Sequence, residues 1–355
     1  MSSLQKVSNG WRVHICVDGY RRSRTFKTKQ QAQAWAENFI ASCKRFGIKQ
    51  STILLREVLD EYANKVTYLK RGCKEELRRI NALKNDLSIS EIPISQITPE
   101  DIENWLRRRI GAISPFTGRP VKSSTIARYY TLLKAVFNRA IAWKYIDASP
   151  CDVVMCPVKE DYRQRVATED EIERLKIAAQ WSEDEVPILN CQRIIAAFVF
   201  ACFTGMRIGE ITDMEESWIE GNTIHIPREA TKTYHGRTIA VPKRALKILN
   251  VVLKANIRPK IFGLKTFQHD ATFRRIRRNA GLDAIYDSEG NLVKEGLNFH
   301  DSRATFCTWA ASPARDGAPR LELLALARQL GHRNLKNLLR YYRKDPVDMI
   351  DRLNS

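Results

Sequence analysis

Side chains that can bind an anion, transfer a proton or act as a nucleophile lie at the ends of expected helices and strands in the C-terminal half of the chain. They are Arg207, Lys232, His300, Arg303, His332 and the adjacent tyrosines Tyr341 and Tyr342. His300 and Arg303 are three residues apart, which places them on one face of a helical turn. Arginine offers a planar fork of donors to anions, histidine and lysine exchange protons, and tyrosine can form covalent intermediates. Together these types could carry out covalent chemistry on an anionic substrate.

Each of these residues also has a structural interpretation when it is taken alone. Arg207 with Glu210 three residues on is usually an ion pair, and a strand lysine such as Lys232 usually faces solvent. A His-x-x-Arg turn is often a helix cap, and a Gly-His pair is often a helix terminus. A tyrosine between arginines often makes only a cation–π contact. The order of these residue types in one domain of a very basic chain favours a catalytic role.

The tripeptide Arg-Tyr-Tyr occurs twice, at residues 128–130 and 340–342. The first pair of tyrosines falls on an apolar helical pattern with Leu133, Val136 and Phe137, and no histidine lies within a turn or two of it. This pattern predicts that the first pair packs within its domain.

The quoted residues resemble the tyrosine recombinase family, the phage-type integrases. The similar segments are "TGMRIGE" at Arg207, "TK" followed by "RTIAVP" at Lys232, "HDSR" at His300 and Arg303, and "LGH" at His332. In this family the nucleophilic tyrosine usually lies nine residues after that last histidine, which is Tyr341. The sequence departs from the family at Ser302, where leucine is common, and in having a second tyrosine, Tyr342, beside the first.

The resemblance implies DNA cleavage and rejoining through a 3′-phosphotyrosine intermediate. Arg207, Arg303 and His332 would donate to the non-bridging phosphate oxygens, and Lys232 would protonate the leaving 5′ oxygen. His300 would either help to take the tyrosine proton or orient the arginines. This scheme needs no metal, no ATP and no other cofactor. The sequence contains no phosphate-binding loop of the Walker type, and its scattered cysteines show no zinc spacing.

The predicted fold class is α+β, mainly α, in three domains. Residues 1–50 are expected to be an arm-type DNA-binding domain made of a small β-sheet plus a helix, because "GWRVHICVDGYRRSRTFKTKQQAQAW" resembles that of lambda-like integrases. Residues 51–158 are expected to form a helical core-binding domain, and residues 159–355 a mixed α/β catalytic domain.

Turn and cap residues predict several element boundaries. Asp18-Gly19 predicts a β-hairpin, and Thr28 with Gln31 predicts a capped helix with Ala34, Trp35, Phe39 and Ile40 on its apolar face. Thr98 and Thr168 are expected to start helices, and Gly205 to end a buried one. Strands are expected on both sides of His235-Gly236, followed by helices to the C-terminus. There, Val347, Met349, Ile350 and Leu353 could dock onto a neighbouring subunit or pack on their own domain.

The formal net charge of +19 favours a polyanion as partner. The longest apolar run, residues 194–203, is half of the ~20 residues that a membrane-spanning helix needs. The N-terminus has no apolar region typical of a secretory signal. The eight cysteines are interpreted as reduced core thiols of a cytoplasmic protein, here in the bacterial host and associated with its nucleoid.

The first 50 residues hold ten lysines and arginines against two acids. Arg21, Arg22, Arg24 and Lys27 are therefore the candidate DNA-binding residues, although a solvated basic hairpin would also fit.

The predicted function is site-specific integration, with excision, of a phage or mobile element. The expected partners are double-stranded DNA attachment sites, a homotetramer on DNA, a host DNA-bending protein and an excision factor. A DNA invertase or a dimer-resolving recombinase stays open within the same class. A non-catalytic DNA-binding regulator is the alternative from another class, and a type IB topoisomerase would share the chemistry without the arm-like domain.

Overall fold

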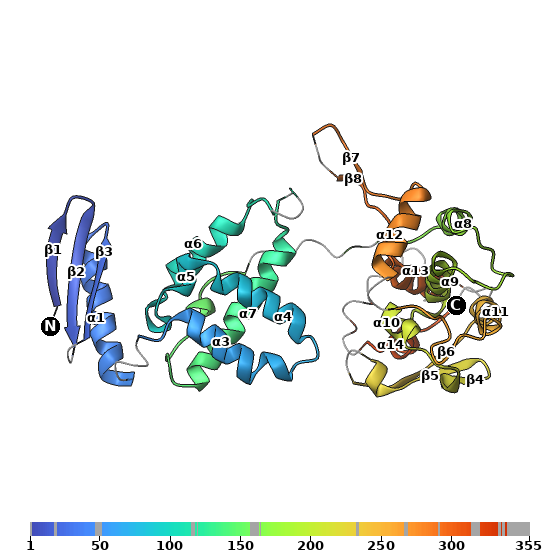
Figure 1. The fold of residues 1–355 in the computed structure, drawn as a ribbon, viewed down its shortest axis with the longest axis horizontal. Coiled ribbons are helices and arrows are strands. Elements are labelled where there is room, and N and C mark those ends of the chain that lie inside the picture. The colour runs from blue at the N-terminus through green and yellow to red at the C-terminus, as the bar shows by residue number, and fades with distance from the viewer. Residues whose placement is uncertain are drawn as a thin grey trace, which may run out of the picture. The chain divides into compact units, whose positions relative to one another are not determined.

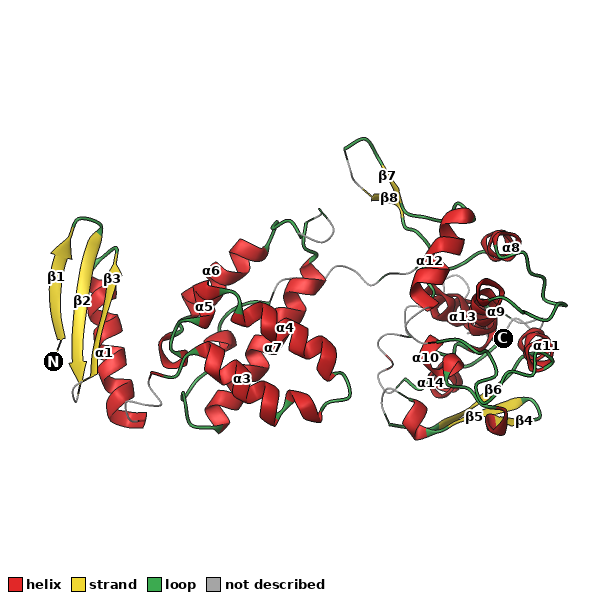
Figure 2. Cartoon of the chain, in the orientation of Figure 1, coloured by secondary structure: helices red, strands yellow, loops and turns green. Residues whose placement is uncertain are grey.

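The computed structural model describes residues 2–17, 20–46, 52–114, 118, 120–156, 163, 165–231, 234–265, 269–289, 292–313, 320–332, 335 and 338. The chain divides into two compact units, residues 1–162 and 163–355. Helices predominate in both, and the described residues form three small antiparallel sheets (Figure 2). The predicted class, α+β with mainly α, is confirmed.

The first unit begins with a three-stranded antiparallel sheet. Its strands are β1 (Ser2–Val7), β2 (Gly10–Val17) and β3 (Tyr20–Phe26), with β2 in the middle. Val17 lies opposite Tyr20, so the predicted hairpin is confirmed, although its turn residues Asp18 and Gly19 lie outside the described residues. The sequence pattern does not predict the first strand, because that segment has little apolar alternation.

The helix α1 (Lys29–Phe46) covers one face of this sheet (Figure 1). The predicted cap is confirmed, because the Gln31 amide donates to the Thr28 hydroxyl over 3.3 Å. Trp35 and Phe39 are buried against the sheet as expected. The prediction is wrong for Ala34, which is exposed; the alanines at positions 32 and 36 are buried instead.

Five helices and three short 3₁₀ turns follow among the described residues of the first unit. They are α3 (Leu55–Lys65), η1 (Thr67–Leu69), α4 (Cys73–Lys84), α5 (Leu87–Ser90), η2 (Ile94–Gln96), α6 (Pro99–Arg109), α7 (Ser123–Ala142) and η3 (Pro150–Asp152). Thr98 caps α6 as predicted, since its hydroxyl accepts from the Asp101 amide over 3.2 Å. The three-domain division at residues 50 and 158 stays a prediction.

The first tyrosine pair packs, as predicted. Tyr130 is 4% exposed, and its hydroxyl lies 2.7 Å from the carbonyl oxygens of both Cys151 and Val154. The Arg109 guanidinium lies 5.2 Å from the centre of the Tyr129 ring. Burial raises the pKa of Tyr130 to about 12, which makes this hydroxyl a poor nucleophile.

The second unit is built around α9 (Asn190–Thr204). Beyond its polar first turn this helix is apolar on all sides, as expected for a helix enclosed by others. Residues 194–204 are all buried, and α8, α10, α11, α12 and α13 pack against it. Gly205 ends α9 with a left-handed φ of 68°, which confirms the predicted helix end.

The remaining described helices and strands belong to this second unit. The helices are α8 (Glu169–Ala178), α10 (Ile208–Thr212), α11 (Lys243–Leu253), α12 (His269–Asn279), α13 (Asp301–Ala311) and α14 (Leu323–Leu330). The strands are β4 (Ile219–Glu220), β5 (Thr223–Ile226), β6 (Arg237–Ala240), β7 (Ile285–Tyr286) and β8 (Leu292–Lys294). Figure 1 shows the β7–β8 hairpin projecting away from the body that contains α9.

Most of the predicted boundaries in this unit hold. The capping box of Thr168 and Glu171 is confirmed, and so is the pairing of the strands on both sides of His235-Gly236. The prediction of helices alone beyond these strands is wrong, because β7 and β8 pair between α12 and α13.

The cysteines differ in exposure. Cys43, Cys151, Cys202 and Cys307 are buried, whereas Cys16 and Cys156 are exposed, so the interpretation as core thiols is wrong for these last two. Within the described ranges, no helix has both the length and the apolar character that crossing a membrane requires.

Candidate active site

Arg207 enters the site through the sharp turn that ends α9. A Cβ atom on Gly205 would lie 2.6 Å from Phe306 and 2.7 Å from Leu330, so only glycine fits this turn without a shift. Arg207 then caps α10 together with Glu210. The two Glu210 oxygens accept from the Arg207 backbone amide over 2.9 Å and from its guanidinium over 3.0 Å.

A second guanidinium, which sequence reasoning missed, holds the same carboxylate. Arg237, the first residue of β6, donates to both Glu210 oxygens over 2.9 and 2.7 Å, and its Nε donates to the Gln329 carbonyl over 2.9 Å. Glu210 is 2% exposed. Burial opposes ionisation of Glu210, but the contacts with Arg237 and Arg207 outweigh it and hold its pKa below the ordinary value.

Arg303 lies in the first turn of α13 and is 6% exposed. Its guanidinium donates to the carbonyl oxygens of Gly205 and, over 3.1 Å, of Leu330. A further N–H lies 3.0 Å from Nε2 of His332. Burial, and then the charge of Arg207, lower the pKa of Arg303. The structure thus brings Arg303 and His332 into direct contact, with Arg207 close enough to affect both.

His332 follows Gly331, which ends α14 with a left-handed φ of 66°. Because arginine can only donate, Nε2 of His332 must accept from Arg303, and a neutral ring then carries its proton on Nδ1. Burial, followed by the charges of Arg303 and Arg207, lowers the pKa of His332 to about 4. The imidazole is therefore neutral at pH 7.

His300 comes directly before α13, and its carbonyl accepts from the Arg303 amide over 3.1 Å. The next residue, Asp301, is buried and caps the turn by accepting from the Asn298 amide over 2.7 Å. Arg163 forms a bidentate ion pair with Asp301, with two N···O distances of 2.7 Å. Sequence reasoning missed Arg163, because 138 residues separate it from its partner.

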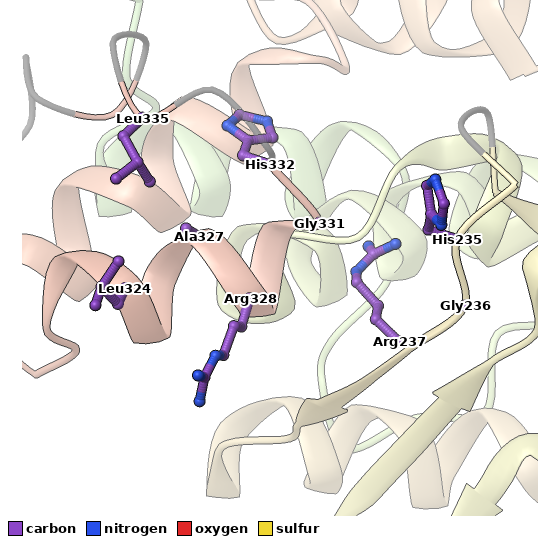
Figure 3. A pocket seen from close by; sticks show the side chains of 9 residues that line it. All are labelled: His235, Gly236, Arg237, Leu324, Ala327, Arg328, Gly331, His332 and Leu335. Atoms are coloured by element: carbon purple, nitrogen blue, oxygen red, sulfur yellow. The ribbon is translucent and has the colours of Figure 1, made fainter.

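A cavity of about 360 Å³ opens beside these groups, between the start of β6 and the end of α14. Figure 3 shows Arg237 reaching from β6 toward Gly331, with His332 just beyond. Leu324 and Leu335 form part of the apolar side of this cavity.

The charge of the assembled groups suits an anion. Among the described residues of the site, the guanidiniums of Arg207 and Arg237 contact the Glu210 carboxylate, the buried guanidinium of Arg303 lies close enough for their charges to act on it, and His332 is neutral. Three positive charges against one negative leave an excess of two. A phosphate oxygen is an acceptor whose charge and geometry match guanidinium donors.

Three predicted features lie outside the described residues. They are Lys232, which follows Thr231 in the connection between β5 and β6, Tyr341 with its neighbour Tyr342, and the apolar residues at positions 347–353.

The N-terminal candidates do not share one face of their sheet. Arg22 and Arg24 lie opposite Ile15 and Val13, on the face that packs against α1. Arg21 lies opposite Cys16 on the other face, together with Arg12 and His14. Lys27 follows β3 and is exposed. Arg21 therefore lies on a different face of the sheet from Arg22 and Arg24, and the role of these residues in DNA binding stays a prediction.

Comparisons with known proteins agree with this architecture. The model of the phage integrase family matches residues 165–347. A putative integrase/recombinase of Haemophilus influenzae is 28% identical, over 98% of this chain and 89% of that protein.

Two solved structures share the fold. The lambda integrase tetramer bound to a Holliday junction has a TM-score of 0.63 at 18% identity, over 97% of this chain and 98% of that one. The Tn1549 transposon integrase in complex with transposon right end DNA has a TM-score of 0.64 at 19% identity, over 85% of this chain and 100% of that one.

Proposed function

The chain belongs to the phage integrase family and is a site-specific recombinase, and we propose that it cleaves and rejoins DNA through a 3′-phosphotyrosine formed by Tyr341. The observation that carries this proposal is the excess of two positive charges among the neighbouring, described side chains of Arg207, Arg237, Arg303 and Glu210. The pentacoordinate transition state of phosphoryl transfer concentrates negative charge on its non-bridging oxygens. Fixed donors in a buried site stabilise such charge more than water does.

In the proposed reaction, the Tyr341 oxygen attacks the scissile phosphorus and the 5′ oxygen leaves with a proton from Lys232. Arg207 and Arg303 donate to the non-bridging oxygens. Three N–H groups of Arg303 are engaged in the structure, so two of its five remain for phosphate. His332, with its proton on Nδ1, supplies a further donor, and His300 assists the tyrosine or orients the arginines.

The covalent intermediate conserves the energy of the broken bond. The 5′ hydroxyl of a second strand attacks the phosphotyrosine, the tyrosine oxygen leaves, and the new phosphodiester forms without ATP. The proposed setting is a homotetramer on two attachment sites in the bacterial nucleoid. A host DNA-bending protein and an excision factor would select between integration and excision of a phage or mobile element.

Residues 1–50 are proposed to bind separate arm sites on DNA, residues 51–158 to bind the core site, and residues 159–355 to cut it. The proposed arm contacts are Arg21, Arg22, Arg24 and Lys27, which belong to β3 or follow it.

A nicked suicide DNA substrate, which loses a short strand after cleavage and so cannot be rejoined, tests the nucleophile. Wild type should form a covalent protein–DNA adduct, Tyr341→Phe should form none, and Tyr342→Phe should retain it. An adduct with Tyr341→Phe but not with Tyr342→Phe would assign the nucleophile to the second tyrosine. No adduct with wild type on cognate sites would favour a non-catalytic DNA-binding regulator.

A further inference from the structure

We propose that Arg237 is a positioning residue of the recombination reaction: it fixes Glu210, and through it Arg207, while clamping the end of α14 that presents His332. This inference rests on the proposed function. Arg237 is not one of the candidate catalytic residues predicted from the sequence. It is linked to Arg207 through Glu210 and to His332 through Gly331.

The Glu210 carboxylate can orient Arg207 only if the carboxylate itself is held still. Oε1 accepts from Arg207 over 3.0 Å and from Arg237 over 2.9 Å. Oε2 accepts from the Arg207 amide over 2.9 Å and from Arg237 over 2.7 Å. Four donors thus fill the lone pairs of one carboxylate, and Arg237 supplies two of them in a bidentate fork.

Arg237 is in turn fixed at its other end. Its Nε donates to the Gln329 carbonyl over 2.9 Å, in the last turn of α14. The Gln329 side chain accepts from the Ala240 amide over 3.0 Å and donates to the carbonyls of Ala240 and Thr204 over 2.9 and 3.1 Å. The hydrogen bonds of Gln329 connect β6, α9 and α14, and Arg237 is anchored to Gln329. The Arg237 guanidinium can therefore hold Glu210 in a fixed position.

The same side chain supports the residue before His332. A Cβ atom on Gly331 would lie 3.1 Å from Cδ and 3.4 Å from Nε of Arg237, so the Arg237 side chain passes close beside the glycine that ends α14 (Figure 3). The His332 amide then donates to the Ala327 carbonyl over 2.9 Å, which fixes the backbone of His332. Arg237 thus reaches both Arg207 and His332 through one intermediate each.

Removal of Arg237 should change the hydrogen-bond partners of the Arg207 guanidinium. Glu210 is buried, so without Arg237 its charge would have Arg207 as its nearest partner. A buried carboxylate that loses one of its two guanidinium partners has an uncompensated charge, so it should bind the remaining guanidinium more tightly. Arg207 would then face Glu210 rather than phosphate, and the excess of positive charge would fall from two to one. Transition-state stabilisation should suffer more than DNA binding, since many phosphate contacts share the binding energy.

The test compares Arg237→Met and Arg237→Lys with wild type in single-turnover cleavage of the suicide substrate. One substrate carries the natural phosphodiester, and the other a methylphosphonate, in which an uncharged methyl replaces one non-bridging oxygen. Arg237→Met should cleave the phosphodiester ~100-fold more slowly, as expected when the transition state is deprived of one donor. On the methylphosphonate its defect should shrink to about fivefold or less, because less negative charge needs stabilising. DNA affinity should stay within about threefold of wild type.

Arg237→Lys keeps the charge but cannot fork, so its phosphodiester defect should be intermediate, roughly tenfold. If Arg237→Met does not fold, this lysine variant carries the same comparison. Arg244→Met is the matched control, since Arg244 forks onto Glu183 in the same unit with contacts of 3.1 and 2.8 Å. It should lose stability and cleave both substrates at the wild-type rate.

Equal defects of the Arg237 variants on both substrates, or wild-type rates on the phosphodiester, would overturn the positioning role while leaving the proposed function intact. Failure of the wild-type protein to form any adduct would overturn the proposed function and this inference with it.

Discussion

The fold lowers the pKa of His332, and this change matters for the proposed chemistry. His332 is neutral because burial and the nearby guanidiniums lower its pKa from an ordinary 6.5 to about 4. Its contact with Arg303 also fixes which nitrogen carries the proton, since Nε2 must accept. A neutral imidazole adds no further positive charge to the three arginines, yet it can still donate one hydrogen bond to a phosphate oxygen.

Replacing His332 with Gln should make the protein less sensitive to mild acid. The unfolded chain binds a proton at His332 with an ordinary pKa, whereas the folded protein does not, so this residue makes stability fall as the pH drops from about 6.5 to about 4. Because His332 is partly exposed, solvent screens its interactions, so urea unfolding at a series of pH values should show wild type losing on the order of 1–2 kcal/mol more than His332→Gln over this window. Parallel pH profiles would show that the folded protein does not hold His332 neutral.

At the scale of elements, the start of α13 carries two candidate catalytic residues, and the segment that enters the second unit holds it in place. Arg163 forks onto Asp301, and the Ala167 amide donates to the Thr305 hydroxyl over 2.9 Å. Asp301 lies between His300 and Arg303 in the sequence. Any change in the ion pair of Arg163 with Asp301 should therefore reach both of these residues.

A double-mutant cycle measures this ion pair. Arg163→Met leaves the buried Asp301 carboxylate without its guanidinium partner, and it should lower the free energy of unfolding by about 1–3 kcal/mol. Asp301→Asn should do the same, and the double variant should lose less than the sum, with a coupling energy of roughly 1–2 kcal/mol. Single-turnover cleavage should fall in both single variants. Additive losses of stability would mean that the two side chains do not depend on each other.

Elements formed by interactions between residues close in the sequence can be predicted from it, whereas those formed by distant residues cannot. The caps at Thr98 and Thr168 and the helix end at Gly205 involve neighbours three or four residues away, so the sequence pattern predicts them. The strand β1 has few apolar residues and exists through pairing with β2, so no local pattern indicates it.

In the candidate site, too, contacts between residues close in the sequence are predictable and contacts between distant residues are not. The contact between Arg207 and Glu210 spans three residues, and the sequence spacing already indicates an ion pair. The contacts of Arg237 with Glu210 and of Arg163 with Asp301 span 27 and 138 residues. One sequence without the fold gives no reason to pair them, because many arginines could meet each carboxylate.

At the scale of the whole molecule, a net charge of +19 should make DNA binding strongly dependent on salt. The N-terminal sheet distributes part of this charge over two faces. On the face away from α1, Arg12 and Arg21 are exposed, and none of the described strand residues on that face is acidic. On the other face, Arg22 and Arg24 flank the core beside Ile15 and Val13, and the Arg24 guanidinium lies 5.2 Å from the centre of the Phe26 ring.

Two double variants that remove the same charge can decide which face meets arm-site DNA. Because Arg12 and Arg21 are exposed, Arg12→Ala with Arg21→Ala should lower the slope of log affinity against log salt concentration by about two, at ~0.9 for each phosphate that the protein no longer neutralises. Arg22→Ala with Arg24→Ala should lower it less, since the Arg24 guanidinium already packs on Phe26. Affinity for an arm-site duplex measured from low to high salt gives both slopes. Cleavage of a core-only substrate should survive in both variants, and equal loss of arm binding and core cleavage would contradict an arm-binding role for this sheet.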